Sequence, residues 1–97
     1  MKKAVLDCAE LSASRERAHD HLKNELGLPD YYGRNLDALY DCLSSEVGEL
    51  EIVFRKAELL EESRYAKKIA ETIFQAAAVT GGRITMEYAD KTEDFQK

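Results

Sequence analysis

The 97-residue sequence has no apolar run approaching the roughly 18 residues that a membrane-spanning helix needs. Two lysines follow the first methionine, but no long apolar stretch comes after them, so a secretory signal is not expected. Both absences predict a cytoplasmic protein that does not contact membranes. The length allows one domain, which we place at residues 1–90, followed by a polar C-terminal tail at residues 91–97.

Basic residues are in deficit, because 14 lysines and arginines face 19 acids and leave a net charge of −5. Direct nucleic-acid binding is therefore not expected, since nucleic-acid-binding proteins usually carry a basic patch.

Cysteine is also scarce. Cys8 and Cys42 are too few for a disulfide framework and form no zinc motif with histidine, which predicts small buried apolar groups. We expect neither a metal nor a cofactor.

Catalytic motifs are missing as well. The sequence contains no G-x-S-x-G, H-E-x-x-H or glycine-rich phosphate-binding motif. His19 and His21 are two residues apart and face different sides of a helix, so each is interpreted as a surface or packing residue. A small hydrolase would need a pocket containing acids with perturbed pKa values. We therefore predict that the chain is not an enzyme.

Three segments alternate apolar and polar residues in the manner of strands, namely residues 3–8, 50–55 and 83–88. Helical segments lie between them, which favours parallel pairing through right-handed crossovers. Each strand has one more polar face, so helices are expected on one side only. We predict a two-layer α/β fold, with a three-stranded parallel sheet and helices packed on one face.

Caps and apolar periodicity predict the helices. Ser12 and Ser14 are both plausible N-caps of a first helix that ends at Leu26, where Gly27 and Pro29 stop it. Asn35 caps a second helix that ends near residue 43. A short helical stretch covers residues 57–62, and Ser63 caps a last helix that ends at residue 79. The expected buried stripes are Leu36, Leu39, Tyr40, Leu43 and Val47 on the second helix, and Ala66, Ile69, Ala70, Ile73 and Ala77 on the last.

Negative charge is concentrated around the second helix. Residues 30–51 contain six acids and one base, Arg34, so this segment accounts for the net charge of the whole chain. Asp37 and Asp41 are one helical turn apart, with Ser44 beside them and Tyr40 at the boundary of the buried stripe. Like charges at this spacing disfavour an isolated helix by a few tenths of a kcal/mol. A solvated acidic surface is the simple interpretation, and a basic partner is the functional one.

Two tyrosines precede this helix. Tyrosine is a good interface anchor because it buries a large area with few rotatable bonds. We expect Tyr32 to pack in the core and Tyr31 to remain exposed near the paired aspartates. An exposed tyrosine beside two acids is more typical of a binding surface than of a device for stability.

The segment Leu28-Pro29-Asp30-Tyr31-Tyr32-Gly33-Arg34-Asn35-Leu36-Asp37-Ala38-Leu39-Tyr40-Asp41-Cys42-Leu43 closely resembles the barstar family of ribonuclease inhibitors. The likeness extends to residues 2–5, to residues 25–26 and, more weakly, to residues 81–86. The resemblance implies the two-layer fold described above. It also implies a function, which is to bind a secreted ribonuclease inside the producing cell and to block its active site. The barstar family is itself a standard example of electrostatic steering and of an aspartate hot spot.

The resemblance also implies the partner-binding residues. Asp41 would enter the phosphate site of the nuclease, Asp37 would pair with a second basic group at its rim, and Tyr31 would stack near a catalytic histidine. Gly33 would allow close backbone approach, and Asn35 would cap the helix and reach the partner. The full set is Tyr31, Gly33, Asn35, Leu36, Asp37, Ala38, Tyr40 and Asp41, to which Ser44 and Glu46 are added as neighbours.

The sequence departs from the family pattern at three positions. Tyr40 stands where a tryptophan is typical, Glu46 replaces another aromatic residue, and Ala76 aligns with an additional partner-facing acid. The expected partner is a basic ribonuclease or nuclease toxin, bound one to one by a chain that is monomeric when free. The alternative is a non-inhibitory adaptor that uses the same acidic helix for a different basic protein.

Overall fold

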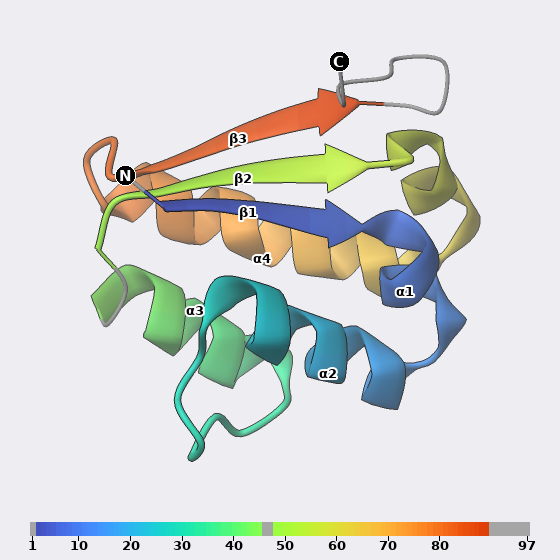
Figure 1. The fold of residues 1–97 in the computed structure, drawn as a ribbon, viewed down its shortest axis with the longest axis horizontal. Helices are drawn as coiled ribbons and strands as arrows, with labels where there is room; N and C mark the ends of the chain where they lie inside the picture. The colour runs from blue at the N-terminus through green and yellow to red at the C-terminus, as the bar shows by residue number, and fades with distance from the viewer. Residues whose placement is uncertain (1, 46–47, 90–97) are drawn as a thin grey trace.

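The computed structural model describes residues 2–45 and 48–89, which include one three-stranded sheet. Strands β1 (Lys2–Asp7), β2 (Leu50–Arg55) and β3 (Ile84–Ala89) are parallel and lie in the order β1-β2-β3. Figure 1 shows the three arrows side by side and running in the same direction. The predicted parallel sheet is confirmed, and each strand begins within one residue of its expected position.

The alternating pattern of the strands turns one face of the sheet toward the helices. Ile52 of the central strand pairs in register with Ala4 and Met86, and this row belongs to the core or packs against it. The opposite face was expected to be polar, but Val53 on that face is 1% exposed. Its burial follows from its position in the central strand, which gives it a neighbouring strand on each side.

The described helices are α1 (Cys8–Ala13), α2 (Arg15–Leu26), α3 (Leu36–Ser45), the 3-10 helix η1 (Ala57–Glu62) and α4 (Arg64–Val79). In Figure 1, α4 runs along the sheet in the direction opposite to the strands, while α2 and α3 lie on the lower side of the view. Helix α3 packs against α4, and α2 packs against α1 and β1. The predicted α/β fold is therefore confirmed, and α3 is left with a broad outer face.

The helix predicted to run from a serine cap to Leu26 is confirmed as α2, and a helix that was not predicted, α1, precedes it. Cys8, expected to end the strand, begins α1, because the Asp7 carboxylate accepts a hydrogen bond from the Ala9 N–H at 2.9 Å. Ser14 then interrupts the helix with φ −165° and ψ 164°, and its hydroxyl accepts from the Arg17 N–H at 3.1 Å. Of the two proposed caps, Ser14 is the one that begins α2.

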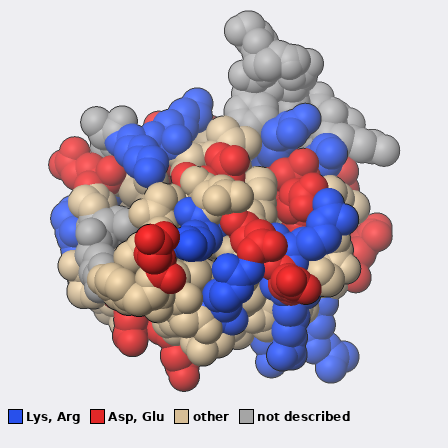
Figure 2. Space-filling model, turned by 60° about the horizontal axis from the view of Figure 1, so that its bottom comes forward, with Lys and Arg blue, Asp and Glu red and all other residues tan. Residues whose placement is uncertain are grey.

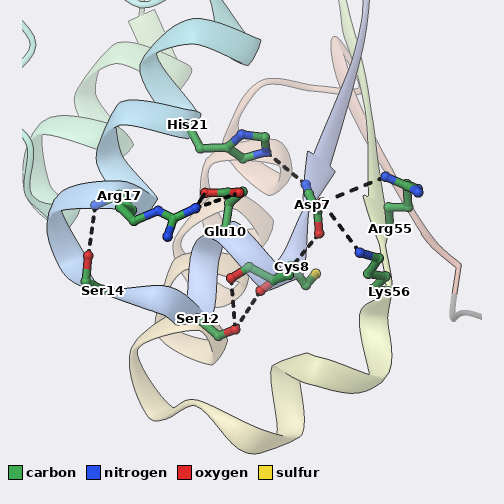
Figure 3. Close-up of polar contacts among 10 residues, drawn as sticks. Asp7, Cys8, Glu10, Ser12, Ser14, Arg17, His21, Arg55 and Lys56 are labelled. Carbon is green, nitrogen blue, oxygen red and sulfur yellow. Dashed lines mark hydrogen bonds and ion pairs between the residues drawn. The ribbon is translucent and has the colours of Figure 1, made fainter.

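Figure 3 shows how the end of β1 is fixed to its surroundings. The Asp7 carboxylate lies 3.8 Å from Arg55 Nη1 and 3.8 Å from Lys56 Nζ. Its backbone N–H donates to His21 Nε2 at 2.9 Å. Ser12, the other proposed cap, instead donates its hydroxyl to a carbonyl oxygen one turn earlier at 2.8 Å. This end of the sheet is a structural junction between β1, β2 and α2.

The other predicted helix ends are largely confirmed. Gly27 ends α2 with φ 68°, a conformation that glycine adopts without strain. The Ser63 hydroxyl caps α4 by accepting from the Ala66 N–H at 3.1 Å. The buried stripe of α4 ends differently, because Ala76 is 0% exposed whereas the expected Ala77 is only partly buried. Ala76 lies three residues after Ile73 and so continues the same face of the helix.

Candidate protein-binding interface

Asn35 fixes the start of α3 and ties the helix to the preceding loop. Its Oδ1 accepts a hydrogen bond from the Ala38 N–H at 2.7 Å, and its Nδ2 donates to the Gly33 carbonyl oxygen at 3.3 Å. The predicted N-cap is confirmed. A Cβ atom on Gly33 would lie 3.2 Å from the Ala38 Cβ, so glycine allows the loop to fold back over the first turn. The loop and the helix therefore form one shaped unit.

Helix α3 separates its apolar and acidic residues onto different faces. Leu39, Cys42 and Leu43 are buried in the core. Asp37 and Asp41 are exposed, one turn apart. Within residues 2–45 and 48–89, neither carboxylate forms an ion pair with a lysine, an arginine or a histidine. Both acids are thus accessible to a cation on another molecule.

Half-buried residues border this acidic face. Leu36, Ala38 and Tyr40 pack against the core and retain part of their surface. Ser44 is also half-buried, and its hydroxyl donates to the Tyr40 carbonyl oxygen at 2.8 Å. Together with the two acids they form a surface that is mixed apolar and negative. Glu46, and Val47 at the expected end of the buried stripe, lie outside the described residues.

The two tyrosines of the loop differ in burial. Tyr32 is 5% exposed and Tyr31 is 72% exposed, as predicted. The Tyr32 hydroxyl lies 2.6 Å from His19 Nδ1 in the interior. Because Tyr32 is anchored there, the loop holds Tyr31 at the surface just before α3.

His19 of α2 joins this anchor to α4. Its Nε2 lies 2.7 Å from the Tyr65 hydroxyl, and the Arg15 guanidinium carbon lies 4.5 Å from the centre of the Tyr65 ring. Burial above all, followed by the charges of Arg34 and Arg15, lowers the pKa of His19 below 6.5. The neutral imidazole donates through one nitrogen and accepts through the other, which suits two hydroxyl partners. His19 is thus the packing residue that was expected, and it links the binding loop to two helices.

Arg34, the one basic residue of segment 30–51, forms its ion pair with α2 rather than with α3. Arg34 pairs with Asp20 on α2, and Lys23 Nζ of α2 lies 3.4 Å from the Asp30 carboxylate in the loop. Figure 2 shows acidic and basic side chains interleaved on the face in view. Helix α3 has two acids and no base. The acids of α3 are therefore not balanced by a base on the same helix.

A groove of about 770 Å³ follows the outer side of the contact between α3 and α4. Asp37, Tyr40 and Asp41 line its α3 side, and Gln75 lies on the α4 side. Ala76, which aligns with a partner-facing acid of the family, is 0% exposed and continues the buried face of α4. Its exposed neighbour Gln75 is one of the α4 residues that line the groove.

The α4 side of the groove was missing from the predicted binding residues. Phe74 is 63% exposed and Val79 is 61% exposed, and both line the groove with Ala78. A signal for them exists in the sequence, because both are large apolar residues that fall outside the buried stripe of α4. Exposed apolar residues of this size are typical of contact surfaces.

Cys8 at the start of α1 is a buried free thiol. Burial, together with Asp7 and Glu58, raises the pKa of Cys8 to about 12, so its thiol stays protonated and unreactive. No cluster of three or more metal-ligating side chains occurs in residues 2–45 and 48–89. Over the same residues, no helix is both long and apolar enough to cross a bilayer.

Comparison with known proteins agrees with this geometry. Residues 1–96 match the family described as "Barstar (barnase inhibitor)". A Bacillus subtilis strain 168 protein with the name "Putative ribonuclease inhibitor YrdF" is 40% identical over 79 residues, which cover 78% of this chain and 86% of the relative. The family match covers nearly the whole chain, and the parallel sheet with its packed helices agrees with it. The chain therefore belongs to the barstar family.

Proposed function

We propose that the protein inhibits a basic ribonuclease by placing α3 and the loop before it in the nuclease active site. The observation that carries the proposal is the pair of exposed carboxylates of Asp37 and Asp41, which have no cationic partner in the described residues. A ribonuclease holds RNA phosphates with arginine, lysine and histidine side chains. A carboxylate on a rigid helix can take the place of a phosphate at such a site.

Each residue of the interface has a role in this proposal. Asp41 occupies the phosphate site, Asp37 pairs with a basic group at its rim, and Tyr31 packs near a catalytic histidine. The partly apolar margin, formed by Leu36 and Tyr40, excludes water from these charge pairs, which strengthens them. Asn35, Gly33 and Ala38 hold the backbone in shape, and Ser44 and Glu46 extend the contact at the far end of the helix.

The comparisons support the class of partner. The family is described as one of barnase inhibitors, and the Bacillus subtilis relative is named as a ribonuclease inhibitor. On this basis the protein acts in the cytoplasm, as the antidote to a nuclease or nuclease toxin, and forms a one-to-one complex. Negative charge on α3 steers a basic nuclease toward the interface and raises the association rate.

A preformed interface also favours tight binding. The Asn35 cap and the buried Tyr32 fix the loop before any partner arrives. Less conformational entropy is then lost on binding, so more of the contact energy appears as affinity.

The test is an inhibition titration of RNA hydrolysis by barnase, with the wild-type protein, Asp41→Ala and the control Glu61→Ala. Glu61 is an exposed acid of η1 that lies 3.2 Å from Lys67, so it controls for the loss of one negative charge. We expect Asp41→Ala to weaken inhibition far more than Glu61→Ala does. Equal losses would remove the role assigned to Asp41.

A capture experiment separates the inhibitor from the adaptor. The immobilised protein is exposed to the secreted and cellular fractions of the producing organism, and captured material is assayed for ribonuclease activity. Recovery of a ribonuclease supports the proposal. Failure to inhibit barnase, combined with recovery of a partner that lacks nuclease activity, would overturn it in favour of the adaptor.

A further inference from the structure

The groove beside the paired aspartates has an apolar wall that charge pairing alone does not explain. Phe74 and Val79 of α4 are both more than half exposed, and they line the same groove as Asp37 and Asp41. Apolar side chains of this size that are exposed to water do not stabilise the fold. They favour association with another molecule. Their position next to the acids indicates that a partner covers them when it meets α3.

We propose that the inhibitory surface continues across this groove onto α4, and that the bound ribonuclease presents an apolar or aromatic side chain beside its basic active site. That side chain packs against Phe74 and Val79 while the nuclease cations meet Asp37 and Asp41. The inference rests on the proposed function and adds a requirement for the partner, which must be apolar as well as basic at its contact surface.

Charge decides between this partner and a second copy of the same chain. In a symmetric homodimer, the same patch of both copies would form the interface. Two such grooves facing each other would bring the Asp37 and Asp41 carboxylates of one copy toward those of the other, with no base on either α3 to separate them. Like charges placed opposite each other oppose association. A basic protein has the complementary charge.

The apolar wall also serves the charge pairs. A side chain seated against Phe74 and Val79 expels water from the groove that Asp41 lines. Ion pairs in a water-excluded setting are stronger than the same pairs in bulk solvent. Residues around an interface hot spot commonly act in this way.

The experiment compares groove variants with matched surface variants in the barnase titration and in titration of any captured ribonuclease. Phe74→Ser and Val79→Ser remove the apolar wall, Phe74→Leu preserves it, and Lys68→Ser changes an exposed residue of α4 outside the groove. We expect Phe74→Ser to weaken binding by about tenfold or more and Val79→Ser by about threefold to tenfold. Phe74→Leu and Lys68→Ser should stay within about twofold of the wild type. Thermal unfolding of each variant checks that the fold is intact.

Phe74 lines two spaces, so the experiment must identify which of them receives the partner. Phe74 also borders a space of about 440 Å³ that Tyr88 lines and that Val79 does not reach. Binding that is weakened by Tyr88→Leu but not by Val79→Ser would place the apolar contact in that hollow and overturn the inference.

Salt distinguishes the two kinds of contact. At about 1 M salt the screening length falls to about 3 Å, so the loss caused by Asp41→Ala should shrink while the loss caused by Phe74→Ser persists. If Asp41→Ala weakens binding and both serine variants bind like the wild type, the inference fails and the proposed function stands. If the wild type inhibits no ribonuclease, the proposed function fails. A concentration-dependent dimer abolished by Phe74→Ser, measured by analytical ultracentrifugation, would assign the groove to a second copy instead.

Discussion

Helices α2 and α3 differ in the contacts that their charged residues make with the loop between them. Asp20 of α2 pairs with Arg34, and Lys23 holds Asp30 of the loop. Asp37 and Asp41 of α3 form no such pair in residues 2–45 and 48–89. Asp20 and Lys23 of α2 therefore hold the loop, whereas Asp37 and Asp41 of α3 are available to a partner.

The largest expected effect is the difference in binding between substitutions of Asp41 on α3 and of Asp20 on α2. Asp41→Ala should weaken ribonuclease binding by at least about 2 kcal/mol, the usual threshold of a hot spot, for which the barnase–barstar complex is itself a standard example. Asp20→Ala should cost less than about 1 kcal/mol of affinity, because it removes an exposed internal pair. Isothermal titration calorimetry with the same nuclease measures both. Similar losses would show that the internal pairing of an acid does not predict its role.

The two helix caps provide the next effect. Asn35→Ala and Ser14→Ala should each lower the free energy of unfolding by about 1 kcal/mol, because each removes a side-chain acceptor at a helix start. Only Asn35→Ala should also weaken ribonuclease binding, since Asn35 shapes the loop before α3. Chemical denaturation and inhibition titration of both variants test this. An equal loss of inhibition in Ser14→Ala would contradict the prediction that only the cap of α3 affects ribonuclease binding.

The pH dependence of stability tests the link between α2 and the binding loop. The pKa of His19 is lowered in the folded protein, mainly by burial, so the unfolded chain takes up this proton at a higher pH. The contribution of neutral His19 is complete above about pH 6.5 and decreases as the pH falls from that value toward the lowered pKa. Urea denaturation between pH 8 and 5.5 should show this decrease, and His19→Gln should reduce it. A profile unchanged by His19→Gln would exclude the assignment.

The smallest effect has opposite signs on the two helices. Asp41→Asn should raise the stability of the free protein by about 0.2–0.5 kcal/mol, because it relieves a like-charge pair one turn apart. Asp20→Asn should lower stability by a similar amount, because it weakens the pair with Arg34. Denaturant midpoints measured at low salt resolve the difference. A loss of stability in Asp41→Asn would mean that this acid is satisfied within the fold.

Local chemistry explains which parts of the fold could be predicted. Asn35, Gly27 and Ser63 act within three or four residues of themselves, so their roles as caps and stops follow from the sequence. Helix α1 could not be predicted as readily. Its cap is Asp7, and whether this side chain caps a helix depends on where the strand ends.

Tertiary packing explains what was missed at the site. The exposure of Asp37, Asp41 and Tyr31 follows from helical periodicity and from the loop pattern. The apolar wall on α4 is brought beside α3 only by the fold, so no local pattern places Phe74 next to Asp41.

The different burial of Tyr31 and Tyr32 has an evolutionary consequence under the proposed function. One of these neighbours secures the loop through His19, while the other has no part in that buried contact. If Tyr31 contacts the nuclease as proposed, substitution at position 31 can change which enzyme is recognised while the scaffold keeps its shape. An inhibitor constructed in this way would follow a diverging nuclease by altering its exterior alone.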